Sequence, residues 1–195
     1  MRAGDNPFNV QKLQSIRYRL SGQTWDGLLE RLATLHWRAA IVGPHGHGKT
    51  TLLKDLMPRL EAHGFRVRSI MLHTGDRRLG REQRDCLFRD LGPRDILCVD
   101  GAEQLGRWSW LALRLRSRAA RGLLITSHRP GLLPTLVDCE TSPELLAGIV
   151  RDLLGGAGEG VDSGPDLVEL WRRHGGNVRD SLWEMYDVWG RKPGR

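Results

Sequence analysis

A glycine-rich segment contains the residues whose types and spacing most clearly suggest chemistry. From Gly43 to Thr50 the sequence reads Gly-Pro-His-Gly-His-Gly-Lys-Thr, which fits the pattern Gly-x-x-x-x-Gly-Lys-Thr. Glycines let backbone N–H groups turn inward around an anion, and a helix that starts there adds the partial positive charge of its N-terminus. A plain glycine turn needs neither the lysine nor the threonine. The segment therefore predicts a phosphate-binding loop.

Each position of this loop has an expected role. Lys49 should reach the β- and γ-phosphates of a nucleotide, and the Thr50 hydroxyl should complete the shell of a Mg²⁺ ion. His45 and His47 occupy variable positions, so we expect them to point outward rather than to take part in metal or acid–base chemistry. The residues expected to contact the nucleotide are Gly43, Pro44, His45, Gly46, His47, Gly48, Lys49, Thr50 and Thr51.

A phosphate-binding loop also needs a carboxylate on a neighbouring strand, which holds the metal and orients water. The apolar run that starts at Asp95 ends in Asp100. We therefore predict that Asp100 shares the Mg²⁺ ion with Thr50. An ordinary Asp-Gly turn at the end of a strand is the alternative interpretation.

The elements that must position these residues follow from the hydropathy pattern. Short apolar runs alternate with longer helical patterns, which is the order expected of a parallel sheet covered by helices on both faces. The predicted strands cover residues 38–43, 66–72, 95–100, 122–128 and 135–140. A helix that Thr24 could cap precedes the first strand, and Pro58 should bend the helix that follows it.

After the last predicted strand the pattern becomes wholly helical. A helix starts at Ser142-Pro143-Glu144, residues 155–165 read as a flexible glycine-rich loop, and two helices are expected at roughly 165–174 and 177–189. We therefore predict a nucleotide-binding α/β domain with a helical lead-in over residues 1–141. Residues 142–195 should form a small helical lid with a short basic tail.

The order of these motifs resembles that of AAA+ ATPases. An additional strand lies between the loop strand and the Asp100 strand, as in the additional-strand class of P-loop NTPases. A polar strand end and a Gly-Asn-x-Arg segment follow in AAA+ order, so the resemblance covers residues from about 38 to 189. It implies a three-layer α/β/α fold with a parallel five-stranded sheet, and binding of ATP and Mg²⁺.

The resemblance also implies roles for three further residues. Gly101 stands where many AAA+ proteins have a glutamate, so Glu103, as in the NACHT-type group, is the substitute candidate for activating water. His128 occupies the position of a γ-phosphate sensor and could donate a similar hydrogen bond. Arg179 matches the lid arginine that reaches nucleotide phosphate. The alternatives are a solvated glutamate at a helix start, a polar loop cap and a surface arginine.

Two shorter features are similar to AAA+ segments. Asn6-Pro7-Phe8 resembles the lead into the adenine site, and Arg129 is the candidate for a finger that reaches into a neighbouring subunit. The winged-helix domain that can follow the lid has no counterpart in this sequence, so contact with DNA does not follow from the resemblance.

Three functions fit these motifs. The first is an AAA+-like ATPase that couples ATP hydrolysis to a protein partner or a neighbouring subunit. The second is a P-loop kinase, with residues 74–84 as an acceptor-binding segment. The third is a nucleotide-gated DNA- or protein-binding module without turnover, in which Arg114, Arg118 and Arg121 line one helix face.

Composition narrows the class of protein. The chain has 195 residues, 39% apolar content and a net charge of +7, which suits a folded domain that attracts polyanions and leaves nucleic-acid binding open. No apolar run approaches the roughly 18 residues of a membrane span, and the N-terminus lacks a secretion signal, so we expect a cytoplasmic protein without a membrane partner. The three cysteines lack zinc-site spacing and are expected to be reduced and mostly buried.

Overall fold

The computed structural model describes residues 6–20, 22–155 and 166–190. By their contacts, the residues form two units. The α/β unit comprises Tyr18–Gly43 and Lys49–Cys139, and the helical unit comprises Met1–Arg17, Pro44–Gly48 and Glu140–Arg195. Part of the predicted phosphate-binding loop and the N-terminal residues thus group with the C-terminal helices. The division into a nucleotide-binding domain and a lid stays a prediction about function.

A parallel five-stranded sheet forms the centre of the α/β unit, as predicted. Its strand order is β2-β3-β4-β1-β5, and every neighbouring pair is parallel. The strands are β1 (Arg38–Val42), β2 (Arg66–Met71), β3 (Asp95–Asp100), β4 (Gly122–Ser127) and β5 (Thr135–Asp138). Because β3 and β4 are neighbouring parallel strands, the polar residues at their carboxyl ends lie close together at one edge of the sheet.

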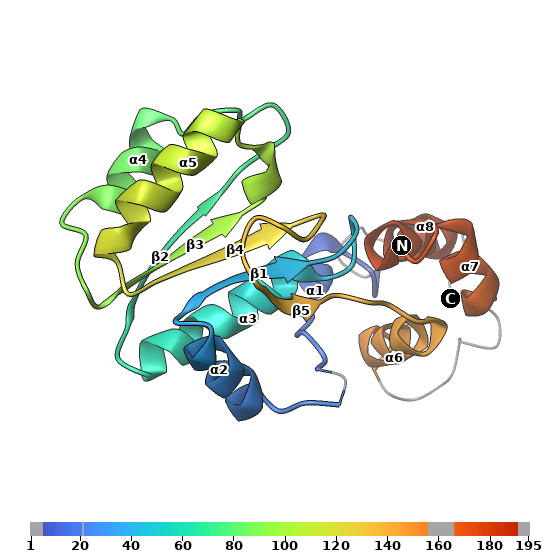
Figure 1. Ribbon diagram of the computed structural model, residues 1–195. Coiled ribbons are helices and arrows are strands. Elements are labelled where there is room, and N and C mark those ends of the chain that lie inside the picture. Colours follow the sequence, from blue (N-terminus) through green and yellow to red (C-terminus); the bar gives the residue numbers. More distant parts are fainter. Residues whose placement is uncertain (1–5, 21, 156–165, 191–195) are drawn as a thin grey trace. The chain divides into compact units, whose positions relative to one another are not determined.

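Helices cover both faces of this sheet, which confirms the three-layer α/β/α fold. The helices of the unit are α2 (Trp25–Thr34), α3 (Lys49–Ala62), α4 (Arg81–Phe88) and α5 (Arg107–Arg116). Figure 1 shows α2 and α3 on one face and α4 and α5 on the other. Along β1, Ala39 and Ile41 pack into the core on the α2 and α3 side, whereas Ala40 and Val42 pack into the opposite core. This alternation is the period of a strand that is buried on both faces.

Local sequence signals explain where these helices begin. The Thr24 hydroxyl accepts the Gly27 N–H at 3.1 Å, which confirms the predicted cap of α2. Helix α3 begins at Lys49 and continues through Pro58 to Ala62, so the proline does not end it. Residues 74–84, proposed as an acceptor-binding segment for a kinase, contain a loop and the start of α4.

The predicted row of arginines on one helix face is wrong. Arg114 lies in α5, but this helix ends at Arg116. Arg118 belongs to a separate 3₁₀ helix, Ser117–Ala119, and Arg121 precedes β4. The change in winding breaks the spacing that would align the three side chains.

The helical unit has its own apolar core. Its helices are α1 (Val10–Gln14), α6 (Pro143–Leu153), α7 (Leu167–Arg173) and α8 (Val178–Gly190). Caps agree with the helix starts predicted at residues 142 and 177: the Ser142 hydroxyl accepts the Leu145 N–H at 3.2 Å, and Asn177 Oδ1 accepts the Asp180 N–H at 3.1 Å. Most of the predicted glycine-rich loop, residues 156–165, lies outside the described residues.

The Asn-Pro-Phe segment is built into this core. Phe8 is fully buried and meets Trp189 edge to face at 5.6 Å between ring centroids. Asn6 donates a hydrogen bond to the Tyr186 carbonyl at 3.0 Å. These contacts give the segment a structural role, and its predicted place beside an adenine site stays a prediction.

Two expectations from composition concern thiols and membranes. Cys98 and Cys139 are buried and Cys86 is exposed, so the prediction of mostly buried thiols fits two of the three. In the described part of the chain, no helix has both the length and the apolar content that crossing a membrane would require.

Candidate nucleotide-binding site

Asp100 and Thr50 meet at the carboxyl end of the sheet. Asp100 is the last residue of β3, and Thr50 lies in the first turn of α3. The Thr50 hydroxyl donates to Asp100 Oδ2 at 2.8 Å. Fifty residues of sequence separate the two side chains, so only the fold brings them together. The predicted metal-binding pair is therefore preassembled in the α/β unit.

Thr126 completes the arrangement around Asp100. This buried residue near the end of β4 donates its hydroxyl to Asp100 Oδ1 at 2.5 Å and accepts the Gly101 N–H at 2.8 Å. Asp100 is thus held by two neutral hydroxyls, and among the described residues it forms no ion pair with a lysine or arginine. A carboxylate accepts about four hydrogen bonds or metal contacts, so capacity for a cation remains.

Sequence reasoning missed Thr126. A hydroxyl in an otherwise apolar buried strand, with Ser127 and His128 after it, was the available signal. Its partner could not be read from the sequence, because that requires the parallel register that places Val99 beside Ile125 and hence Asp100 next to Thr126. The residue fixes the orientation of the carboxylate rather than adding a charge.

Lys49 is buried at the start of α3. Its ammonium group donates to the Gly43 carbonyl at 2.7 Å, across the ends of the predicted loop. No acidic residue occupies the first turn of α3, so the positive end of the helix dipole is not offset by a carboxylate on the helix itself. The lysine and the helix N-terminus therefore both favour an anion.

Gly101 departs from the AAA+ pattern for a structural reason. Its φ angle is +81°, and a Cβ atom at this position would lie 2.9 Å from the Leu72 carbonyl oxygen. A glutamate here would combine a left-handed backbone with a backbone clash. The chain instead turns into the 3₁₀ helix Ala102–Gln104, which contains Glu103.

Glu103 and His128 lie together. His128 Nε2 is 3.3 Å from Glu103 Oε1, so the two candidates for positioning water form one pair. The other carboxylate oxygen of Glu103, Oε2, is buried and has no hydrogen-bond partner among the described residues. A buried carboxylate oxygen without a donor is costly, and a water molecule would relieve that cost. Glu103 is therefore only partly solvated, with 21% of its side chain exposed, and its role toward water stays a prediction.

The central part of the predicted loop, Pro44–Gly48, is described within the helical unit. Gly46 has a φ angle of +78°, and a Cβ atom there would overlap the side chain of Asn177, with 1.7 Å to Oδ1. Only glycine fits this position. The ring of His47 is half-buried beside Gly176, and its Nδ1 lies 3.0 Å from the His45 carbonyl oxygen. His45 is exposed as expected, but His47 does not point outward.

The remaining predicted residues are the two arginines. Arg179 is exposed and lies in the first turn of α8, in the helical unit, where the predicted helix start at residue 177 placed it. Arg129 is exposed just beyond β4, where its carbonyl accepts the Ser127 hydroxyl at 2.8 Å. The roles of both side chains toward a nucleotide stay predictions.

The sequence matches no protein-family model and no curated protein. Solved structures do match. NtrX from Brucella abortus, solved in complex with ATP, is 13% identical with a TM-score of 0.57, covering 95% of this chain and 54% of that chain. A second NtrX structure is 15% identical with a TM-score of 0.53, covering 94% and 54%. RuvB, the Holliday junction branch migration motor of Thermotoga maritima, is 14% identical with a TM-score of 0.49, covering 94% and 72%.

This chain therefore spans about half the length of the NtrX chain that it matches. At such low identity the likeness concerns the arrangement of strands and helices and no particular residue. The parallel sheet with order β2-β3-β4-β1-β5, helices on both faces and the predicted phosphate-binding segment after β1 agree with that likeness. Together with the match to NtrX, they show that this chain has the α/β/α fold of the matched part of NtrX, and the resemblance to AAA+ ATPases in function stays a prediction.

Proposed function

We propose that this protein binds ATP and hydrolyses it in the presence of Mg²⁺. The observation that carries the proposal is the contact of 2.8 Å between Asp100 Oδ2 and the hydroxyl of Thr50, the last residue of the Gly-x-x-x-x-Gly-Lys-Thr segment. NtrX, which shares the fold, was solved in complex with ATP. This supports the choice of ATP as the nucleotide.

The donors in the α/β unit fit Mg²⁺. This ion prefers oxygen ligands and commonly takes one or two from the protein, leaving the rest to water and substrate phosphates. Thr50 and Asp100 supply a hydroxyl and a carboxylate oxygen, and Thr126 keeps the carboxylate in one orientation. When bound, Mg²⁺ would neutralise charge that develops on the phosphate oxygens.

The chain's own residues divide the remaining tasks. Backbone N–H groups of residues 43–51 and the Lys49 ammonium bind the phosphates, which requires Lys49 to exchange the Gly43 carbonyl for a phosphate oxygen. Glu103 accepts a proton from the attacking water through Oε2, its unpaired oxygen, while His128 holds Oε1.

We assign Arg179 to the γ-phosphate. The support is chemical, because a cation in the first turn of α8 opposes the helix dipole and gains if an anion binds nearby. Through this arginine the helical unit would respond to the state of the nucleotide. That response is the proposed means of acting on a protein partner or a neighbouring subunit.

ATP binding and release of phosphate, measured in parallel for matched variants, test the proposal. Lys49→Ala should weaken ATP binding by about 100-fold or more, because a buried phosphate partner is lost. Lys54→Ala, an exposed lysine of the same helix, is its control and should bind normally. Glu103→Gln should bind ATP and lower turnover by about 100-fold, as expected on removing a general base.

The same assay separates the competing functions. Glu61→Gln, an exposed glutamate at the end of α3, is the control for Glu103→Gln. Normal turnover in Glu103→Gln would remove this residue from the mechanism, and unaltered ATP binding in Lys49→Ala would overturn the assignment of the loop. Phosphate that appears on an added acceptor instead of free in solution would identify a kinase.

A further inference from the structure

Helix α5 exposes three large apolar side chains on its outer face. Trp108 is 83% exposed, Leu111 44% and Leu115 49%, whereas Leu113 of the same helix is buried in the core. Their spacing of three and four residues places them along one side of the helix. We call these three residues the α5 stripe. Exposed tryptophan and leucine in a continuous row are uncommon on a surface that meets only water.

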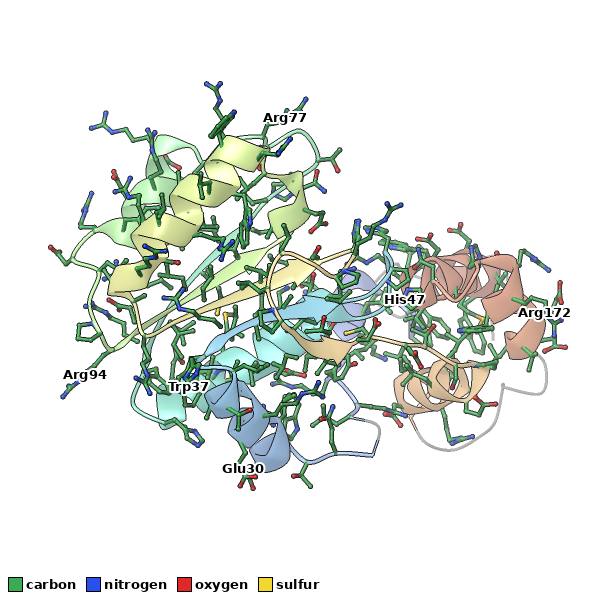
Figure 2. All side chains as sticks on the ribbon, viewed as in Figure 1. Glu30, Trp37, His47, Arg77, Arg94 and Arg172 are labelled. Atoms are coloured by element: carbon green, nitrogen blue, oxygen red, sulfur yellow. The ribbon has the colours of Figure 1, made fainter. Side chains whose placement is uncertain are left out.

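Positive charge borders the α5 stripe. Arg107 and Arg114 of the same helix and Arg118 just after it are exposed. The sequence contains no aspartate or glutamate from Gln104 to Val137. Gly106 also donates its N–H to the Arg77 carbonyl at 3.0 Å, which brings a further exposed arginine to the start of α5. Figure 2 shows Arg77 at the outer edge of the molecule on the α5 side of the sheet.

The arginines at the end of α5 lie close enough to affect one another. Burial lowers the pKa of Arg38, and the nearby charges of Arg114 and Arg118 lower it further. Arg38 donates to backbone carbonyls of Ser117 and Ala120, at 2.7 and 3.3 Å, rather than to a carboxylate. The positive field around this end of the stripe is therefore not neutralised by those contacts, and an anionic partner would relieve it.

We propose that the α5 stripe is a docking surface for an acidic amphipathic helix of a partner protein. Apolar side chains of that helix would cover Trp108, Leu111 and Leu115, and carboxylates on its flanks would face Arg107, Arg114 and Arg118. Tryptophan and arginine are the side chains that most often dominate the binding energy of protein interfaces. The surface lies outside the nucleotide-binding residues, so the inference does not depend on the proposed ATPase activity.

The composition of the surface favours this partner over two others. Nucleic acid would use the arginines and could stack on Trp108, but the exposed leucines would gain nothing from a phosphate backbone. A second copy of this chain that used the same face would bring its arginines against these arginines, which is unfavourable. An acidic amphipathic helix satisfies both the apolar row and the charge.

A designed peptide serves as the probe. It is a fluorescently labelled helix with leucines at positions i, i+3, i+4 and i+7 and glutamates on both flanks. The comparison peptides are a scrambled sequence of the same composition and a version with lysine in place of glutamate. Fluorescence anisotropy should show that the full chain binds the acidic amphipathic peptide at least about tenfold more tightly than either comparison peptide.

Variants then locate the binding site. Trp108→Ala should weaken binding of the acidic peptide by about tenfold or more, as expected for an interface hot spot. Arg114→Glu should weaken binding and reduce its dependence on salt. Trp183→Ala, which removes a 44% exposed tryptophan of α8, is the matched control and should bind normally. Trp108→Ala should keep the far-UV circular dichroism spectrum and the cooperative thermal unfolding of the native chain, which shows that this variant folds.

Three results would overturn the proposal. The first is equal binding of the acidic and scrambled peptides, or binding that Trp108→Ala leaves unchanged. The second is binding of a labelled DNA duplex that depends on Trp108 and that the peptide does not displace. The third is concentration-dependent self-association of the native chain that Trp108→Ala abolishes, which would make a second copy the occupant.

Discussion

The two ends of β3 carry aspartates with opposite surroundings. Asp95, at the start of the strand, is fully buried and accepts hydrogen bonds from Arg66, from Arg68 and, at 2.6 Å, from the Gly92 N–H. Asp100, at the end of the strand, meets only the neutral hydroxyls of Thr50 and Thr126 among the side chains described. The same residue type is thus compensated by cations at one end and left without a cation at the other.

This difference separates a structural carboxylate from a candidate metal ligand. The hydrogen bond from Arg66 is the largest cause that lowers the pKa of Asp95 to about 2, and the Gly92 N–H and Arg68 lower it further against the effect of burial. The negative charge of Asp95 is therefore already compensated by Arg66 and Arg68. Asp100 keeps free acceptor capacity beside the N-terminus of α3, where a nucleotide-bound metal would lie.

The largest expected effect comes from removing the charge of Asp100. Asp100→Asn should lower Mg²⁺-dependent ATP turnover by about a thousandfold, because a metal ligand contributes several kcal/mol to the transition state. Its free energy of unfolding should change little, because the amide oxygen can accept from Thr126 while the amide NH2 donates to the Thr50 hydroxyl oxygen. Steady-state phosphate release and urea denaturation of the same preparations measure both quantities. Wild-type turnover in this variant would abolish the distinction between the two aspartates.

The matching change at Asp95 should show the reverse pattern. Asp95→Asn should lower the free energy of unfolding by about 3 kcal/mol, because it leaves two arginines beside a buried neutral amide. Arg66 is 58% exposed, which keeps the loss at the lower end for such pairs. ATP affinity should stay within about twofold of the native value once the protein is folded. A larger loss of affinity would show that the two ends of β3 are coupled.

The pH dependence of stability should sharpen the contrast. Because the pKa of Asp95 is lowered to about 2, the unfolded chain takes up a proton at higher pH than the folded chain. The stabilisation from this group is present above about pH 4 and is lost as the pH falls toward 2, by about 2 kcal/mol in total. In urea titrations between pH 5 and pH 2.5, Asp95→Asn should lack this part of the acid sensitivity. An identical pH dependence in the two proteins would contradict the assignment.

A smaller effect is expected at the residue that orients Asp100. Thr126→Val keeps the shape of the side chain but removes a donor to Asp100 Oδ1 and an acceptor for the Gly101 N–H. The free energy of unfolding should fall by about 1–2 kcal/mol, the usual cost of unpaired buried groups. Mg²⁺ titration of ATP turnover should show a weaker apparent affinity for Mg²⁺. Thr126→Ser restores the hydroxyl and should recover most of that affinity.

Local features of the sequence were enough for much of the fold. The apolar runs placed all five strands within one or two residues, because a buried strand needs consecutive apolar side chains. Thr24, Ser142 and Asn177 marked helix starts correctly, since a cap acts within its own turn. The arginine row failed because a short 3₁₀ segment after Arg116 is not marked by any such local signal.

The same distinction between local signals and tertiary contacts applies to the candidate site. The sequence by itself determined that a segment with the pattern of a phosphate-binding loop and an aspartate at a strand end are present, because spacing along the chain defines those patterns. Only the tertiary structure decided that Thr126 holds Asp100, that Glu103 pairs with His128 and that Trp108 stays exposed. The first two facts depend on the strand order, which brings residues far apart in the sequence to one edge of the sheet, and the third depends on which face of α5 packs on the sheet. No local pattern encodes which distant side chains will meet.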